Sequence, residues 1–268
     1  MSQINTNLLS LNAQRNTSNS QMVLGTTMQR LSSGLRVNSA KDDSAGLAIA
    51  ERMQAQIKGM NVAIRNANDA ISLAQTAEGA LGKVGDMLQR MRELAVQSAN
   101  ATNAQGDRDN LDTEYQDLAA EITRTIDATR FNGLQVLSAD AGTQTFQVGA
   151  NSTDTVDIAT NDVSATFTAG DLTSQANATT EIDNLDTAID AFNTERALYG
   201  SAQNRFDAIV STLQVGAEAQ SSARSRIMDA DFAAETANLS RAQVLQQAGN
   251  AMIAQANQAP QQVLALLR

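Results

Sequence analysis

Apolar residues recur at helical spacing over much of the chain. From Ile57 to Ala95 they follow one another at intervals of three and four residues, with Glu78 as the single polar member of the series. A heptad pattern of this length is typical of a helix that packs along its whole length. It predicts one helix of roughly 39 residues, about 58 Å long at 1.5 Å per residue.

The helical pattern stops and then returns twice. Residues 100–106 read Asn-Ala-Thr-Asn-Ala-Gln-Gly, which is a cluster of turn-forming residues. Helical spacing returns over 111–126 and again over 182–227. Because a short loop joins the first two long segments, we expect them to form an antiparallel pair, whose core the third segment completes.

A different pattern occupies residues 131–180. Residues 145–148 and 155–158 alternate between apolar and polar side chains and are separated by Gly-Ala-Asn-Ser, which predicts a β-hairpin. A third strand is expected near 165–168. The Ser-, Thr- and Asn-rich residues 174–180 show no periodicity and are expected to form a loop.

Both ends of the chain have a helical pattern that is poor in apolar residues. Backbone ordering costs about 1 to 2 kcal/mol per residue, so neither end should hold a helix in isolation. We expect the N- and C-terminal helices to pair with each other and then with neighbouring copies of the chain. The residues expected to form these self-assembly contacts are Ile4, Leu8, Leu11, Leu24, Met28, Leu31, Phe232, Leu239, Leu245 and Met252.

The composition agrees with helices rather than with a deep globular core. The chain is 42% hydrophobic but only 3% aromatic, so its core should be extensive yet thin, as in helices packed along their length. The patterns and the composition together predict a mainly α fold. This fold is a long coiled-coil-like helical bundle with a small β-hairpin region and paired N- and C-terminal helices.

The charge is unevenly distributed. No Lys or Arg lies between Arg130 and Arg196, whereas that interval holds ten Asp and Glu residues. The net charge of -10 therefore belongs to the middle of the chain, since the remainder carries equal numbers of acids and bases. This balance argues against nucleic-acid binding, and it should keep the middle segment in water.

Few kinds of catalytic chemistry are open to this composition. The chain has no Cys, His or Trp, which excludes a zinc site of the usual ligands, a Ser-His-Asp or Cys-His nucleophile and a disulfide framework. It has no glycine-rich phosphate loop, and the adjacent carboxylates of Asp42 and Asp43 should point in different directions. Methionines such as Met28, Met60 and Met91 fall on apolar positions, where we expect them to pack. We therefore expect no enzyme activity, no cofactor and no metal.

Membrane and export signals are also lacking. No run of about 18 apolar residues occurs, so membrane insertion is not expected. The N-terminus lacks a basic region followed by an apolar stretch, which argues against a cleaved Sec signal. The chain should either stay in the cytoplasm or leave it by another route.

Longer motifs occur at both ends of the chain and in its helical middle. They include Ile4-Asn5-Thr6-Asn7, residues 29–46, Arg65-Asn66-Ala67-Asn68-Asp69-Ala70, Arg92-Glu93-Leu94-Ala95-Val96-Gln97, Phe131-Asn132-Gly133, Ser222-Ala223-Arg224-Ser225-Arg226-Ile227 and Ala254-Gln255-Ala256-Asn257-Gln258. These motifs resemble those of bacterial flagellin, and the likeness covers nearly the whole chain. Longer flagellins insert large outer domains where this sequence has only about residues 160–180, so it resembles a short, core-only flagellin.

The resemblance implies a domain arrangement and a function. Residues 1–45 and 229–268 would pair as an inner terminal-helix domain, and 46–228 would form an outer helical core domain that includes the β-rich segment 131–180. Flagellins self-assemble into a hollow helical filament for swimming motility, and their ends fold on polymerisation. Export by the flagellar type III route would make this a secreted structural protein of the extracellular filament. The implied partners are other copies of the chain, the flagellin export chaperone, the filament cap and the hook-filament junction proteins.

The resemblance also implies recognition by a host. Arg90, Leu94 and Glu114 match the part of flagellins that is recognised by the vertebrate Toll-like receptor 5 (TLR5). Exposed arginines beside apolar residues are common in binding hot spots. At the C-terminus, the apolar residues resemble the region seen by cytosolic flagellin sensors and gripped by the export chaperone. These residues are Val263, Leu264, Leu266 and Leu267.

Two other functions remain open at this point. A hook-filament junction protein of the same superfamily would share the terminal helices but cap one end of a polymer. A cytoplasmic coiled-coil scaffold would explain the heptads and the missing Sec signal, but not two terminal segments that must find each other. An enzyme built on carboxylates is the weakest interpretation, because the sequence offers no base with an orienting group.

Overall fold

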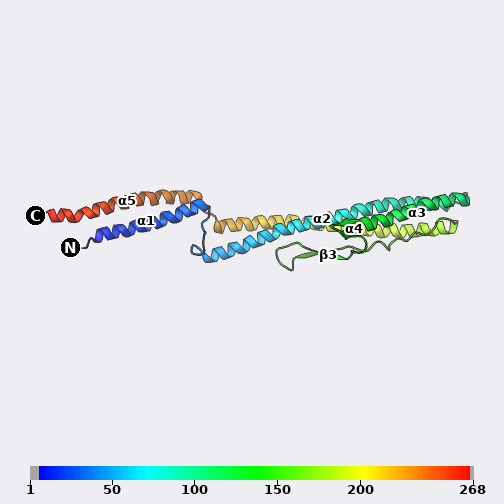
Figure 1. Ribbon diagram of the computed structural model, residues 1–268, viewed down its shortest axis with the longest axis horizontal. Coiled ribbons are helices and arrows are strands. Elements are labelled where there is room, and N and C mark those ends of the chain that lie inside the picture. Colours follow the sequence, from blue (N-terminus) through cyan, green and yellow to red (C-terminus); the bar gives the residue numbers. More distant parts are fainter. Residues whose placement is uncertain (1–5, 266–268) are drawn as a thin grey trace. The chain divides into compact units, whose positions relative to one another are not determined.

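The structure is a computed structural model that describes residues 6–265, with side chains described for 6–258. Figure 1 shows that helices dominate it. The elements in chain order are α1 (Leu8–Ser33), α2 (Ser44–Ser98), α3 (Gln105–Ala128), β1 (Arg130–Phe131), β2 (Leu134–Gln135), β3 (Thr143–Gln147), β4 (Thr155–Ala159), α4 (Gln175–Met228) and α5 (Phe232–Ala265). The chain divides into two compact units. One unit is Gln56–Glu218, and the other joins the residues up to Ala55 with those from Ala219 onward.

The predicted heptad series forms the core of the unit Gln56–Glu218. In this unit α2, α3 and α4 run alongside one another (Figure 1), and most of the series from Met60 to Ala95 is buried. Its polar member, Glu78, accepts a hydrogen bond from Gln203 Nε2 of α4 at 2.7 Å, so a partner helix satisfies the one carboxylate on the seam. The predicted mainly helical fold, with paired terminal helices and a small β region, is confirmed.

Helix α2 begins earlier than the heptad series predicts. It has 55 residues, against the roughly 39 expected from the length of the series. The Asp43 carboxylate accepts a hydrogen bond from the backbone N–H of Gly46 at 2.8 Å. An acidic side chain in this position caps the start of a helix, and the helix therefore begins at Ser44 rather than near Ile57.

The predicted hairpin is present and packs on two of the helices. Strands β3 and β4 pair antiparallel, with Phe146 opposite Val156. The Phe146 ring meets the edge of Phe206 on α4, with 5.7 Å between ring centroids. At the hairpin tip, a Cβ built on Gly59 of α2 would lie 2.7 Å from the Cβ of Ala150. The glycine therefore allows the tip to lie directly against the helix backbone.

The expectation of a loop over residues 174–180 is wrong. Helix α4 begins at Gln175, and its first turn is capped by Ser174. The Ser174 hydroxyl accepts a hydrogen bond from the backbone N–H of Asn177 at 3.1 Å. Small polar residues are typical of both loops and helix N-termini, so the absence of apolar periodicity could not separate the two.

The third strand expected near 165–168 does not form. These residues form a turn and irregular backbone, and the segment that follows is held by side chains instead of by a sheet. The backbone N–H of Gly170 donates to Glu181 at 3.2 Å, and the carbonyl of Leu172 accepts from the buried Ser98 hydroxyl at 2.7 Å. Side chains of α2 and α4 thus satisfy backbone groups that a neighbouring strand would otherwise bind.

The second unit is built around α1 and α5. Helix α1 ends at Gly34, whose φ of 71° is in the left-handed region that favours glycine. The next residue, Leu35, forms an antiparallel bridge with Asp229, between α4 and α5. This bridge brings the end of α1 next to the start of α5. A small apolar cluster beside it contains Val37, Ala50 and Met228.

Candidate assembly and recognition surfaces

Helices α1 and α5 meet through small and polar side chains. The buried residues of this seam are Ser10, Thr17 and Thr27 on α1, and Glu235 and Ala242 on α5. A Cβ built on Gly249 of α5 would lie 2.5 Å from the Thr17 hydroxyl oxygen. Because glycine has no Cβ, the two helix backbones can approach closely at this point.

Polar contacts fix the register of the α1/α5 pair near both of its ends. The Asn7 side chain donates through Nδ2 to the carbonyl of Ala256 at 2.7 Å and accepts from the backbone N–H of Ser10 at 3.1 Å. At the other end, Arg30 Nη1 lies 3.1 Å from Glu235 Oε1. The Glu235 side chain is only 10% exposed, so removing the arginine would leave a carboxylate that is largely out of water without its ion pair.

Most of the apolar residues predicted to form assembly contacts lie outside this seam. Leu8, Leu11, Met28, Phe232, Leu245 and Met252 are exposed in the single chain. Leu24, Leu31 and Leu239 are partly buried. Ile4 and the C-terminal Leu266 and Leu267 lie outside the described residues, and so do the side chains of Val263 and Leu264.

Sequence reasoning missed the seam because it followed apolar residues only. The seam has heptad spacing, but small and polar residues occupy most of it. On α1 the spacing of three and four residues runs through Ser10, Ala13, Thr17, Ser20, Leu24, Thr27 and Leu31. A search for Ser, Ala, Thr and Gly at heptad positions could have found this close approach.

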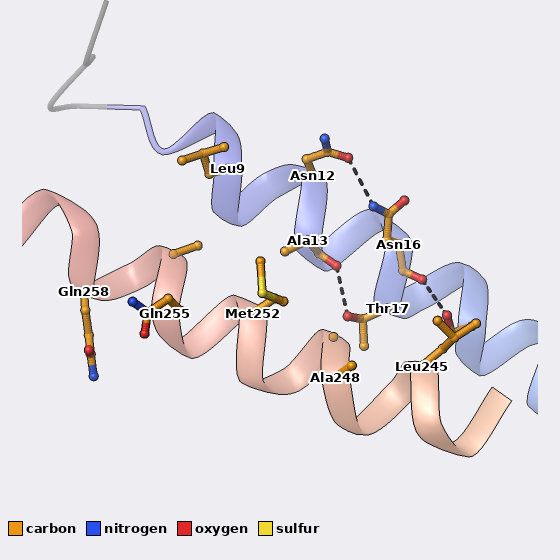
Figure 2. Close-up of a pocket in the computed structure, with 13 residues that line it drawn as sticks. Leu9, Asn12, Ala13, Asn16, Thr17, Leu245, Ala248, Met252, Gln255 and Gln258 are labelled. Atoms are coloured by element: carbon orange, nitrogen blue, oxygen red, sulfur yellow. Dashed lines mark hydrogen bonds between the residues drawn. The ribbon is translucent and has the colours of Figure 1, made fainter. Parts of the chain in front are cut away.

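A groove runs along one side of the α1/α5 pair. It encloses about 520 Å³, and Figure 2 shows Met252 and Leu245 of α5 on the side that faces α1. Apolar, small and amide side chains line it together. A smaller hollow of about 180 Å³ continues it past Ser20 to Val23 and Arg241. The lining residues include Leu9, Asn12, Ala13, Asn16, Thr17, Leu245, Ala248, Met252, Gln255 and Gln258.

Arg90 and Glu114, predicted to contact a host receptor, form an ion pair between α2 and α3. The Arg90 guanidinium donates to Glu114 Oε1 at 2.8 and 3.0 Å and to Glu93 Oε2 at 2.9 Å. The hydrogen bonds to Glu93, and then to Glu114, raise the pKa of Arg90 above its usual value. All three side chains are about half exposed or more, so they form a charged surface patch.

Leu94, the third residue predicted to contact a receptor, lies beneath this surface. It is 1% exposed and belongs to the core of the unit Gln56–Glu218. The neighbouring surface of α2 holds a shallow depression of about 470 Å³. Its lining includes the exposed Val96 and also Arg92, which is ion-paired with Asp186 of α4 at 2.6 Å. An apolar contact on this face is therefore available from Val96, whereas Leu94 holds the helix in place.

The buried Tyr115 and Glu181 side chains join α3 to α4. Tyr115 donates its hydroxyl proton to Glu181 at 2.6 Å. Burial, and then this hydrogen bond, raise the pKa of Tyr115 above its usual value. Across residues 6–265, no group of three or more Asp and Glu side chains is arranged to hold a metal ion. Within the same residues, no helix is long and apolar enough to cross a bilayer.

Comparison with known proteins decides the family. The bacterial flagellin N-terminal helical region matches residues 4–145, and the bacterial flagellin C-terminal helical region matches 182–267. A flagellin of Halalkalibacterium halodurans is 47% identical over 270 residues, which cover 99% of each chain. The chain belongs to the flagellin family. It is a short, core-only flagellin and not an enzyme, and flagellins are the subunits that self-assemble into the extracellular flagellar filament.

Solved structures agree with this family. A crystal structure of Bacillus cereus flagellin matches 56% of this chain and 88% of its own, with a TM-score of 0.53 and 40% identity. A putative flagellar hook-associated protein from Vibrio parahaemolyticus matches 70% of this flagellin chain and 100% of its own, with a TM-score of 0.61. At 15% identity, the second likeness is one of fold alone.

Proposed function

We propose that this flagellin polymerises through the outer surfaces of its α1/α5 pair and thereby supports swimming motility. The observation that carries the proposal is where the exposed apolar side chains lie. Ten of the sixteen large apolar residues exposed in the described chain belong to α1 or α5. Exposed apolar surface concentrated on one pair of helices is typical of protein interfaces. These ten are Leu8, Leu9, Leu11, Met22, Val23, Met28, Phe232, Val244, Leu245 and Met252.

The apolar residues fall on different sides of the helix pair. Leu9 and Val23 line the groove with Leu245. Leu8 and Leu11, in contrast, lie about half a turn from the buried seam of α1, on the side away from α5. Two different apolar surfaces on one subunit favour a head-to-tail contact. In such a contact, the groove of one copy meets the Leu8 and Leu11 side of the next copy. Contacts of this kind build open helical polymers.

The thin seam supports coupling between ordering and assembly. Its buried members are mostly small or polar, so the α1/α5 contact removes little apolar area from water. Ordering these helices costs about 1 to 2 kcal/mol per backbone residue. Burial against neighbouring copies would supply the missing stabilisation, and the terminal helices would then order only as the filament grows.

Two variants test this function. Deletion of residues 229–268 should leave a soluble monomer, because it removes α5 and half of the groove. Replacing both Leu8 and Leu11 by Ser should likewise prevent polymer formation. The matched control replaces Val62 and Val215, which are exposed on α2 and α4. Electron microscopy that finds normal filaments from the deletion variant would defeat the proposal.

The same proposal extends to the arrangement and partners of the subunit. Residues 1–45 with 229–268 would form the inner part of the filament, and 46–228 the outer part. The C-terminal segment with Val263, Leu264, Leu266 and Leu267 would be bound by the export chaperone and by cytosolic sensors, and growth would involve the filament cap and junction proteins. Identity of 47% to a flagellin over the whole chain, against 15% to a hook-associated protein, favours a filament subunit over a junction protein.

Toll-like receptor 5 would recognise the surface around Arg90 and Glu114. Both side chains are exposed and joined across two helices, which supports a preformed polar contact, while the buried Leu94 would act by holding α2 in place. Arg90→Ala with Glu114→Ala should reduce receptor activation in reporter cells. The matched control, Arg124→Ala, removes another exposed, ion-paired arginine of the same unit. Equal activation by all these variants would overturn this part of the proposal.

A further inference from the structure

Methionine is the readily oxidised side chain that this protein presents to solvent. The sequence has no Cys, His or Trp, and both of its tyrosines, Tyr115 and Tyr199, are buried. Exposure governs which thioethers an oxidant can reach. The distribution of exposed methionines therefore decides where oxidation would modify the chain.

Within residues 6–258, the exposed methionines all lie on the α1/α5 pair. Met22 and Met28 of α1 and Met252 of α5 are 62%, 57% and 61% exposed. In the other unit, Met60 and Met91 are buried in the helical bundle. Met60 and Met91 pack as expected, whereas Met28, which is also predicted to form assembly contacts, is exposed in the single chain. The three exposed thioethers remain reachable in the free subunit whether or not its ends are ordered.

We propose that Met22, Met28 and Met252 form an oxidation site through which peroxides block assembly of the free subunit. The inference rests on the proposed function, because it requires the outer surfaces of the α1/α5 pair to be buried between copies. In the reaction, the thioether sulfur attacks one oxygen of a peroxide and the O–O bond breaks. With hydrogen peroxide the products are a methionine sulfoxide and water, so the sulfur is oxidised and the peroxide is reduced.

The sulfoxide changes the surface in the direction that opposes assembly. Met252 lines the groove with Leu245 and Ala248 (Figure 2), and its flexible apolar side chain can fit a neighbouring apolar surface there. A sulfoxide adds a polar oxygen that must be desolvated when a second copy covers it. Oxidation at this site should raise the critical concentration for polymerisation about tenfold, which corresponds to about 1.4 kcal/mol.

Once the filament has formed, the same burial should protect these residues. The order of events then matters. Peroxide added to free subunits should stop polymerisation, whereas peroxide added to finished filaments should leave the three sulfurs largely unmodified. Methionine sulfoxide reductases reverse the oxidation, and reduction of the modified subunit should restore assembly.

The test uses the full-length chain and hydrogen peroxide as the probe. Free subunits are oxidised, the peroxide is removed, sulfoxides are located by peptide mass spectrometry, and the critical concentration is measured by sedimentation. The triple variant Met22→Leu, Met28→Leu and Met252→Leu keeps a similar volume and should polymerise with or without peroxide. The control variant Met60→Leu with Met91→Leu keeps all three exposed sulfurs and should remain sensitive.

The outcomes separate this inference from the proposed function. Normal assembly of wild-type subunits that carry sulfoxides at Met22, Met28 and Met252 would overturn the inference. Equal peroxide sensitivity of the triple Leu variant would also overturn it, because the damage would lie elsewhere. Failure of untreated wild-type subunits to polymerise would instead count against the proposed function. Equally rapid oxidation of the three sulfurs in filaments and in free subunits would show that these surfaces stay open, and would overturn the inference.

Discussion

The close contact between Gly249 and Thr17 gives a direct test of how α1 and α5 pair. In Gly249→Ala, the new Cβ would lie 2.5 Å from Thr17 Oγ1 and 3.5 Å from Thr17 Cβ. The first distance is a clash and the second is an ordinary contact. The Thr17 hydroxyl also donates to the carbonyl of Ala13 at 2.9 Å, so moving it away costs a local hydrogen bond. Either this hydroxyl or the helix backbone must shift.

The expected magnitude follows from two opposing effects. Overpacking of a well-fitted contact costs about 1–3 kcal/mol, whereas replacing glycine by alanine inside a helix contributes about 1 kcal/mol of helix stability. The cost of overpacking exceeds the gain in helix stability over most of the range of about 1–3 kcal/mol. We therefore expect Gly249→Ala to weaken the α1/α5 pair by about 1 kcal/mol and to raise the critical concentration for polymerisation roughly fivefold.

A second substitution identifies the clashing atom. Thr17→Ala removes the hydroxyl and keeps the Cβ, so the double variant of Gly249→Ala with Thr17→Ala should regain the lost stability. The control is Gly25→Ala on α1, where a Cβ meets nothing within 4 Å. It should not weaken assembly. Sedimentation after seeded growth measures the critical concentration of the wild type, Gly249→Ala, the double variant and Gly25→Ala. A double variant that assembles no better than Gly249→Ala would refute the reasoning.

Three further predictions concern ionisation and packing. Burial raises the pKa of Tyr115 and of Tyr199, so the free energy of unfolding should be unaffected by these groups below the ordinary tyrosine pKa of about 10 and should fall above it. Alkaline unfolding followed by tyrosinate absorbance should show both ionising only as the fold is lost; ionisation before unfolding would contradict this. Arg30→Glu should impair assembly and be partly rescued by Glu235→Arg, measured by sedimentation; no rescue would argue against the ion pair. Gly59→Ala should destabilise the unit Gln56–Glu218 by about 1–3 kcal/mol, because the hairpin tip leaves no room for a Cβ, and unchanged thermal unfolding would contradict it.

The long heptad series shows what repetition in a sequence can establish. Burial of one apolar stripe from Met60 to Ala95 requires only that some partner helix covers it, and the sequence offers two other long periodic segments. The pattern therefore predicted the bundle and its antiparallel first pair. It did not predict what Glu78 would meet, because a hydrogen bond to Gln203 depends on the relative register of α2 and α4.

Local chemistry was harder to interpret where one residue type serves two purposes. Ser174 caps a helix although its surroundings resemble a loop. Leu94 and Arg90 belong to one motif, yet one is in the core and the other is on the surface. Leu94 is on the side of α2 that packs against the partner helices, whereas Arg90 is on the side that faces solvent. Which side of α2 is covered depends on how the bundle packs.

The sequence by itself determined that the chain is helical and that it carries the motifs of a flagellin, and it predicts that the ends, which are poor in apolar residues, do not fold alone. Tertiary structure alone decided which sides of those ends are buried. The closest part of the α1/α5 seam runs through Ser10, Thr17 and Gly249, and most of the predicted leucines lie outside it. Close approach of two backbones depends on the absence of side-chain volume, which a search for hydrophobic residues does not detect. Leu8, Leu9, Leu11 and Leu245 consequently remain on the surface.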